Sequence, residues 1–266
     1  MLINIACGDA YIPEWNNFDY FPHSKFVRKT NLLEGLPIKD GLADVVYSSH
    51  FLEHIPRHAV SSFIAECSRV LRSGGRLRLV LPDMEELCRT YLFYREKGKN
   101  EMANFLMLEM FDQCVRTTPG GELGAYYKCL TSDRAMYHQY ETFVQDRTGH
   151  LINSEISSCN SIIKINVIQK IVLRLEKIYC NAVIGLLPKA FRMQNVSRTP
   201  IGEKHHWIYD YYTVRQLLIS AGFIKVERCT ANTSSIDNFP YYPLDVRKNG
   251  SPRKGCESMY IEAEKP

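Results

Sequence analysis

The stretch that decides the fold covers residues 43–83 and reads ADVVYSSHFLEHIPRHAVSSFIAECSRVLRSGGRLRLVLPD. It begins with a β-branched run and ends with RLRLVLP, and both ends have the composition of buried strands. Between them, apolar residues recur at helical spacing from Val60 to Leu71, and Gly74 and Gly75 stop the pattern. A strand, a helix and a second strand in this order predict a crossover unit of a parallel sheet.

Further strands are predicted on both sides of this unit, at residues 2–7, 17–19, 25–30, 223–229 and 258–263. A helix with apolar positions from Val214 to Ala221 precedes the last two strands and is stopped by Gly222. Residues 84–200 differ, because they are rich in helix formers, lack strand alternation and contain a Pro-Gly-Gly break at 119–121. We interpret them as a largely helical insertion into an α/β domain.

The composition excludes several classes of protein. Of the 266 residues, 45% are hydrophobic and 23% are charged, which is typical of a globular chain and excludes disorder and collagen. The net charge of +4 does not indicate a nucleic-acid binder. The nine cysteines are scattered and form no CxxC pair, and no signal peptide is recognisable, so we expect reduced thiols and a cytoplasmic protein. No uncharged apolar run is long enough to span a membrane.

Small and polar residues stand at the ends of the first strands, where ligands bind in an open parallel sheet. The first strand ends at residues 6–8, where the small side chains let a ligand approach the backbone. Asp19 ends the second strand, and a carboxylate there can accept hydrogen bonds from both hydroxyls of a ribose. The dinucleotide fingerprint GxGxxG is missing, because Asp9 and Ala10 stand where it needs glycine, which argues against a nicotinamide-dependent oxidoreductase.

The chain resembles the class I S-adenosylmethionine-dependent methyltransferases of the type 11 group in the order of its motifs, NIACG at 4–8, NFDY at 17–20, NLLEGLPIKDGLADVVYSSHFLEHI at 31–55 and ECSRVLRSGGRLRLVLPD at 66–83. HHWIYDYYTVRQLLISAGFIKVERC at 205–229 and ESMYIEAEKP at 257–266 are similar to bacterial members associated with surface-polysaccharide and lipopolysaccharide synthesis. The resemblance covers residues 2–98 and 203–266.

This resemblance implies an α/β, Rossmann-like class I methyltransferase fold with a seven-stranded sheet in the order 3-2-1-4-5-7-6, its last strand antiparallel. Residues 1–98 and 203–266 would form the domain that binds S-adenosylmethionine. Residues 99–202 would be a mainly helical insertion that serves as a lid, an acceptor-binding part or an oligomerisation surface.

The resemblance also implies that S-adenosylmethionine is the methyl donor and that S-adenosylhomocysteine is the product. The cofactor-binding residues that it implies are Ala6, Cys7 and Gly8 under the methionine part, Asp19 at the ribose hydroxyls, Asn31 and Leu32 beside the adenine, and Ser48 and Ser49, with His50 next to them, where the fourth strand meets the donor sulfonium.

His50, Glu53 and His54 match the inverted zincin motif HxxEH, which holds zinc in a group of proteases. That chemistry needs both histidines on one helical face, whereas this motif begins at the end of a strand. A magnesium site is a second interpretation, but magnesium prefers oxygen ligands. We favour a third, in which Leu52 and Ile55 pack in the core while Glu53 and His54 orient the next helix. No metal is therefore expected, and activity is predicted to need no added ion.

Methylation of an oxygen requires the acceptor hydroxyl to lose a proton, so we expect a base within hydrogen-bond reach of it. Histidine suits this role because its unperturbed pKa is about 6.5. The candidates are His54, His205, His206 and, at the end of the fifth strand, Asp83. The resemblance favours a hydroxyl of a sugar or glycan precursor, free or lipid-linked, as the acceptor. A small natural product or peptide as the acceptor, or a non-catalytic module that binds only the cofactor, are the alternatives.

Residues 160–192 show an amphipathic pattern, with six basic residues and one acidic residue, a local charge of +5. Lys164, Lys170, Arg174 and Lys177 lie opposite an apolar face. Such a helix is typical of a membrane surface, but a lid or dimer helix with a solvated basic face gives the same pattern. We favour the lid, with peripheral contact to the inner face of the membrane as a secondary role and a homodimer contact as an alternative.

Overall fold

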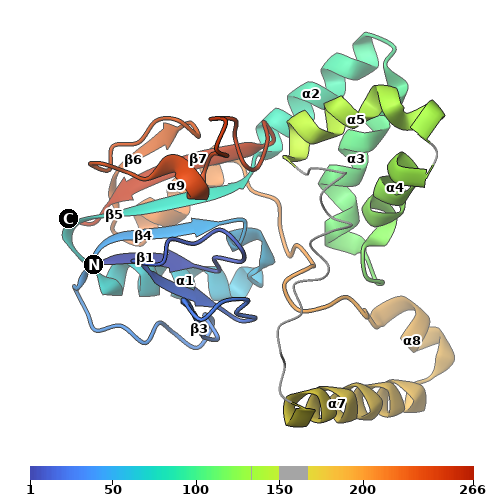
Figure 1. The fold of residues 1–266 in the computed structure, drawn as a ribbon, viewed down its shortest axis with the longest axis horizontal. Coiled ribbons are helices and arrows are strands. Elements are labelled where there is room, and N and C mark those ends of the chain that lie inside the picture. The colour runs from blue at the N-terminus through green and yellow to red at the C-terminus, as the bar shows by residue number, and fades with distance from the viewer. Residues whose placement is uncertain (133, 150–166) are drawn as a thin grey trace.

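The computed structural model of this protein describes residues 1–132, 134–149 and 167–266. Its centre is a seven-stranded sheet in the order β3-β2-β1-β4-β5-β7-β6 (Figure 1). The strands are β1 (Leu2–Ile5), β2 (Asn16–Asp19), β3 (Val27–Lys29), β4 (Ala43–Ser49), β5 (Leu71–Pro82), β6 (Ile224–Cys229) and β7 (Ser258–Glu264). Strands β1 to β5 pair in parallel, and β7 pairs antiparallel with both β5 and β6. Thus β7 is the one strand of this sheet that runs in the opposite direction. The predicted fold class and strand order are confirmed.

The two faces of the sheet are covered in different ways. Helices α1 (Arg57–Val70) and α9 (Tyr211–Ser220) pack on one face. The other face is covered by Trp15 and by the segment 230–257, which follows β6 and contains the short helix α10 (Tyr241–Leu244). Alternate residues of each central strand point to opposite faces, so the strands bury apolar side chains on both sides.

The passage from α1 to β5 differs from the prediction. The apolar spacing placed Leu71 in the helix and a turn at Gly74 and Gly75, whereas β5 already begins at Leu71 and runs through both glycines. A Cβ atom on Gly75 would lie 2.9 Å from the carbonyl oxygen of Arg72 and 3.0 Å from that of Ala43. The second glycine therefore serves close backbone packing at an irregular pairing of β5 with β4 rather than a helix stop.

Four helices form a second group beside the sheet, α2 (Met84–Glu96), α3 (Asn100–Val115), α4 (Gly121–Ser132) and α5 (Arg134–Thr148) (Figure 1). Leu87 of α2 is buried against Leu106 and Met110 of α3. Helix α2 lies within residues 1–98, which the resemblance assigns to the domain of the sheet. Its buried side chain Leu87 nevertheless packs on residues of the predicted insertion 99–202. The helical part thus begins where β5 ends.

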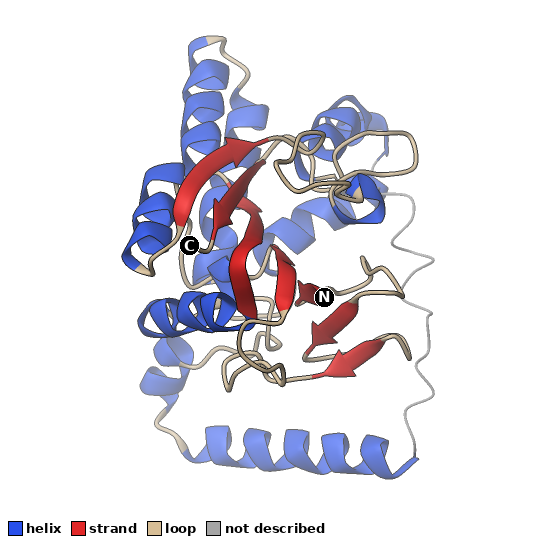
Figure 2. Ribbon diagram, turned by 90° about the vertical axis from the view of Figure 1, so that its left-hand side faces the viewer, coloured by secondary structure: helices blue, strands red, loops and turns tan. Residues whose placement is uncertain are grey.

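Helices α7 (Val167–Leu186) and α8 (Lys189–Asn195) lie apart from the sheet and from helices α2–α5 (Figures 1 and 2). Most of the described apolar side chains of α7 are exposed, from 42% for Val183 to 87% for Leu186. In this part of the described chain the amphipathic helix packs on neither group, and residues 160–166 of the predicted pattern lie outside the described residues. None of the described helices is both long enough and apolar enough to cross a membrane.

One buried arginine joins the segment 230–257 to the sheet. The Arg78 side chain of β5 is fully buried, and its guanidinium donates to the carboxylates of Asp245 (Nε, 2.8 Å) and Glu262 (Nη1, 2.5 Å). It also donates to the carbonyl oxygens of Thr230 (2.9 Å) and Thr233 (3.1 Å). Since Glu262 stands on β7 directly opposite Arg78, this cation links two strands and the covering segment.

We expect the substitution Arg78→Leu to lower the free energy of unfolding by about 3–5 kcal/mol, because it leaves two buried carboxylates without their cation. Denaturant unfolding followed by circular dichroism measures the change. Arg72→Leu is the matched control, since Arg72 is half exposed and pairs with Asp44 at the surface, where a pair contributes about 1 kcal/mol or less. Equal losses for the two variants would contradict the role given to Arg78.

Candidate active site

A cavity of about 500 Å³ lies beyond the carboxyl ends of β1, β2 and β3. Two residues of the turn after β1 have positive φ, Ala6 at 52° and Gly8 at 50°. A Cβ atom on Gly8 would meet nothing within 4 Å, so its backbone conformation, not crowding, favours glycine there. The open backbone of this turn forms one wall of the cavity.

Asp19 joins this turn to the end of β2. Its Oδ2 accepts a hydrogen bond from the backbone N–H of Gly8 (2.9 Å), and its Oδ1 accepts one from Phe21 (2.8 Å). Each carboxylate oxygen can accept a second hydrogen bond. The carboxylate lines the cavity, so it has acceptor capacity for two hydroxyl groups of a ligand.

The far wall of the cavity is mostly apolar, with Leu32, Leu33, Phe51 and Ile55. Asn31 also lines it, and its side-chain amide donates to Glu34 (2.8 Å). An apolar slot next to a hydroxyl-binding carboxylate fits the adenine and ribose of a nucleoside. The residues present therefore fit the adenosyl part of S-adenosylmethionine.

Three of the residues expected at the cofactor do not line this cavity. Cys7 is buried, and this burial raises the pKa of its thiol to about 12. Ser48 is buried inside β4, and the hydroxyl of Ser49 accepts a hydrogen bond from Arg253 (3.4 Å). His50, the next residue, does line the cavity and has a positive φ of 51°.

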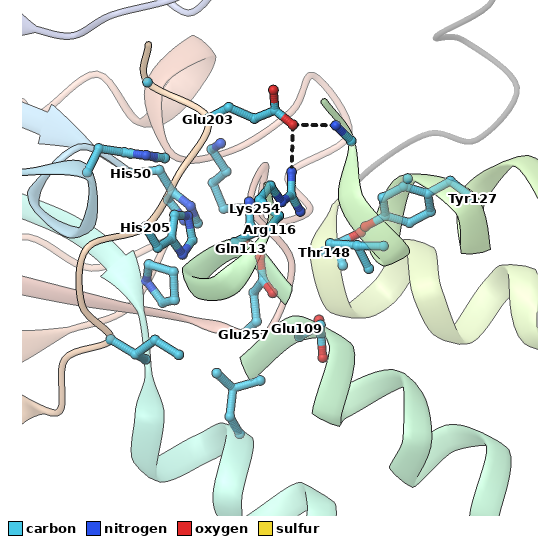
Figure 3. A pocket seen from close by; sticks show the side chains of 18 residues that line it. His50, Glu109, Gln113, Arg116, Tyr127, Thr148, Glu203, His205, Lys254 and Glu257 are labelled. Carbon is cyan, nitrogen blue, oxygen red and sulfur yellow. Dashed lines mark hydrogen bonds and ion pairs between the residues drawn. The ribbon is translucent and has the colours of Figure 1, made fainter. Parts of the chain in front are cut away.

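A second cavity, of about 520 Å³, lies between the end of the sheet and the helical group (Figure 3). Most of its lining side chains are polar or charged, and they are His50, His54, Glu109, Gln113, Arg116, Tyr127, Thr148, Glu203, His205, Lys254 and Glu257. They come from the motif after β4, from α3, α4 and α5, from the chain before α9 and from the segment before β7. Such a wall suits a polar acceptor rich in hydrogen-bonding groups.

Residues 202–207, which we call the strap, connect the elements that form the walls of the two cavities. The backbone N–H of His205 donates to the carbonyl of Gln113 (3.0 Å) in α3, and that of His206 donates to the carbonyl of Glu53 (2.6 Å) in the 3-10 turn η1 (Leu52–His54). The Glu203 carboxylate accepts hydrogen bonds from Arg116 and from the backbone of Gly120 (Figure 3). The strap is thus tied both to the sheet and to the helices.

The two cavities share three lining residues, His50, His54 and Gly202. We call this shared place the junction. A ligand bound in one cavity can contact a ligand bound in the other cavity here. Burial keeps its histidines neutral, since it lowers the pKa of His54 to about 4 and the pKa of His50 well below its usual value. Each therefore presents one nitrogen lone pair at neutral pH.

Two further titratable residues lie close to His54, namely His205 and Glu53. Burial lowers the pKa of His205 to about 2 and raises the pKa of Glu53 to about 8. Glu53, His54 and His205 each offer one ligand atom, and these atoms lie within 4.8 Å of one another. This is a group of side chains that could hold a metal ion.

The other two candidate bases, Asp83 and His206, line neither cavity. Asp83 caps α2 by accepting hydrogen bonds from the backbone of Glu85 and Glu86, and its other oxygen pairs with Arg228. The His206 side chain is exposed, whereas its neighbour His205 is buried. Of the candidates, His54 and His205 are the ones beside the acceptor cavity.

Several lining residues carried no signal in the sequence. Three polar residues of α3 and its C-cap follow one another at helical spacing, Glu109, Gln113 and Arg116. Polar residues have the same spacing on any solvated helix. Lys254 and Glu257 lie in an irregular segment, and only the tertiary fold brings them to the cavity.

Comparison with known proteins gives one family. Residues 19–79 match the family model described as a methyltransferase domain. The matched residues include Asp19, Asn31, His50 and His54, which line the cavities, and the sheet order agrees with this type of domain. Together they support S-adenosylmethionine as the cofactor and methyl transfer as the reaction.

The solved structures that are similar to the chain include two methyltransferases that use S-adenosylmethionine. The one from Thermotoga maritima is 11% identical, with a TM-score of 0.40 over 100% of this chain and 81% of that chain. The one from Archaeoglobus fulgidus is 13% identical, with a TM-score of 0.40 over 99% of this chain and 85% of that chain. No curated protein matches the chain. At this level the likenesses do not bear on the acceptor or on a link to polysaccharide synthesis.

We expect Asp19→Ala to weaken binding of S-adenosylhomocysteine about a hundredfold, because two hydrogen bonds to a charged acceptor are lost. Isothermal titration calorimetry measures the dissociation constant, and circular dichroism checks that the fold is kept. Asp9→Ala is the control, since Asp9 is exposed in the same turn and does not line the cavity. An unchanged dissociation constant for Asp19→Ala would remove this carboxylate from the cofactor site.

Proposed function

We propose that this protein transfers the methyl group of S-adenosylmethionine to a hydroxyl of a sugar or glycan precursor. The observation that carries the proposal is the junction, where a cavity suited to a nucleoside meets a polar cavity at His50, His54 and Gly202. When bound, S-adenosylmethionine supplies an electrophilic methyl group on a sulfonium. The chain's own contribution is then to hold the two reactants in line and to keep water out of the junction.

The donor cavity supplies orientation. Asp19 and the open turn at Ala6 and Gly8 would bind the ribose and the methionine part, while Asn31 and Leu32 would lie beside the adenine. These groups come from the ends of three adjacent strands and are fixed by the sheet. The cofactor's reactive end would then face His50 and His54.

The acceptor cavity supplies hydrogen bonds and charge. Gln113, Lys254 and Glu257 offer donors and acceptors from different directions, and the aromatic ring of Tyr127 gives one apolar face (Figure 3). This combination suits a sugar ring, which has polar edges and apolar C–H faces. An apolar natural product would offer these half-buried polar groups no hydrogen bonds. The neutral imidazoles of His54 and His205 line this cavity, and each has a lone pair that would accept a hydrogen bond from the acceptor hydroxyl as it loses its proton.

The test is methyl transfer to a panel of acceptors, detected by mass spectrometry. The panel contains nucleotide sugars, lipid-linked glycans, phenolic natural products and peptides. Methylation of a sugar hydroxyl supports the proposal, and methylation only of a phenol or peptide contradicts the acceptor class. Calorimetric binding of S-adenosylmethionine without transfer to any acceptor would favour a binding module without catalysis.

We expect Gln113→Ala to raise KM for the acceptor about two- to tenfold, the equivalent of one hydrogen bond, while the dissociation constant of S-adenosylhomocysteine stays unchanged. Gln113 lines only the acceptor cavity, so donor binding has no reason to change. Asn104→Ala is the control, since Asn104 is exposed on the outer side of the same helix. A loss of cofactor affinity in Gln113→Ala would mean that the two cavities are not separate sites.

The exposed helix α7 supports a lipid-linked acceptor. Among its apolar side chains, Leu175, Ile178 and Tyr179 are 60–70% exposed. Arg174 and Lys177 are exposed on the same helix. An apolar face edged by cations suits the surface of an anionic bilayer. We infer that α7 holds the enzyme peripherally at the inner face of the membrane, where a lipid-linked substrate lies.

Reversing the charges with Arg174→Glu and Lys177→Glu should weaken binding to phosphatidylglycerol vesicles at least about 30-fold, since each basic residue near the surface contributes about 1 kcal/mol and each new carboxylate is repelled by the anionic lipid. Vesicle sedimentation at two salt concentrations measures this, with phosphatidylcholine vesicles as the neutral reference. The pair Arg215→Glu and Lys248→Glu is the control, since it makes the same change in charge at exposed sites away from α7. No vesicle binding, together with a dimer in light scattering, would assign α7 to a homodimer contact.

A further inference from the structure

Glu53 is a buried carboxylate that lacks a hydrogen-bond donor. Its side chain is 1% exposed, and within the described chain neither carboxylate oxygen has a hydrogen-bond partner. His50 Nδ1 lies 3.4 Å from its Oε1. Burying such a group alone is unfavourable, so either a proton or a cation must compensate it.

His50 contacts both a serine hydroxyl and Glu53. Its Nε2 lies 2.8 Å from the hydroxyl oxygen of Ser258, and the 3.4 Å between its Nδ1 and Glu53 Oε1 is long for a hydrogen bond. A neutral imidazole offers one hydrogen to these two neighbours. Even with that hydrogen on Nδ1, Glu53 Oε2 has no donor among the described residues, so the carboxylate keeps acceptor capacity for a cation.

Two further imidazoles converge on the same place. His54 Nδ1 lies 3.1 Å from the carbonyl oxygen of Lys204, which can only accept, so Nδ1 carries the hydrogen and Nε2 the lone pair. A backbone carbonyl that fixes the second nitrogen in this way is typical of a metal-binding histidine. The His205 ring stands edge-on to that of His54, with 4.6 Å between the ring centroids.

The spacing of the ligand atoms is close to what one ion needs. One atom each from Glu53, His54 and His205 lies within 4.8 Å of the others. Two ligands of one ion lie no further apart than about 4.4 Å, twice a bond of about 2.2 Å, so small side-chain rotations suffice. Lys254, a cation that lines the acceptor cavity, has no ion pair with Glu53 among the described residues.

We propose that Glu53, His54 and His205 bind one divalent transition-metal ion at the junction of the two cavities. Two imidazole nitrogens and one carboxylate suit zinc, manganese or iron better than magnesium, which prefers oxygen ligands. Three protein ligands leave a position open for a substrate oxygen. We therefore replace the sequence-based prediction of a metal-free site.

The role of the ion, unlike its binding, rests on the proposed function. A hydroxyl bound to a divalent ion loses its proton more readily than a free one. The acceptor oxygen would release its proton to solvent and form the new O–C bond. The C–S bond to the methyl group would break, and its electron pair would remain on sulfur, which becomes a neutral thioether.

The binding test uses the full chain, stripped of metal with EDTA and then titrated with Mn²⁺ under electron paramagnetic resonance. Manganese is the first probe because exposed thiols such as Cys129 and Cys180 bind zinc but bind manganese poorly. We expect one ion per chain, and at least about a hundredfold weaker binding in Glu53→Gln and His205→Ala. His58→Ala is the control, since His58 is exposed on α1 and should bind the ion normally.

Calorimetry with S-adenosylhomocysteine checks each variant, because a variant that fails to fold also loses this ligand. Failure of the apoprotein to bind one Mn²⁺ or one Zn²⁺, or equal affinities in Glu53→Gln, His205→Ala and the parent, would overturn the site. Metal binding without methyl transfer would support the site and count against the proposed function. Full turnover in EDTA would overturn the role of the ion in catalysis.

Discussion

The ion pairs of Arg78 determine where the later part of the chain can lie. Because the guanidinium is buried and bonded to Asp245, to Glu262 and to two backbone carbonyls, the segment 230–257 cannot leave the sheet without exposing unpaired charges to an apolar interior. That segment brings Lys254 and Glu257 to the acceptor cavity, and the strand after it brings Ser258 to His50. The ion pairs of Arg78 on the covered face of the sheet thus position the side chains of Lys254 and Glu257 at the acceptor cavity.

The strap makes a second connection of this kind. It is hydrogen-bonded to α3 through His205 and to η1 through His206, and Glu203 binds the start of α4. These bonds fix the helical wall of the acceptor cavity relative to the strand ends that form the donor cavity. Methyl transfer needs the reacting atoms in line and close together, so a rigid strap serves the reaction better than a mobile one.

The sequence predicted the sheet well, because the alternation of strands and helices indicates a parallel sheet and the resemblance implies its strand order. At the site, Asp19, Asn31 and Leu32 could be placed because the carboxyl end of a parallel strand is a ligand edge whatever the topology. Cys7 and Ser48 could not, since neighbouring residues point in different directions and only packing decides which one faces the cavity. The sequence favours Glu53 as a residue that orients the next helix, because its burial without a partner and its closeness to His205 are properties of the fold.

The walls of the two cavities come from different parts of the chain, and substitutions in these parts have different consequences. The donor wall consists mainly of strand ends from the first 55 residues, whereas the acceptor wall comes from helices, strap and loop. A substitution in α3 or α4 can therefore alter the acceptor without disturbing the cofactor. At the junction this freedom ends, because His50 and His54 belong to both walls and Glu53 lies buried behind them. Replacing His50 or His54 changes both cavities at once, so chemistry and binding are coupled at that place.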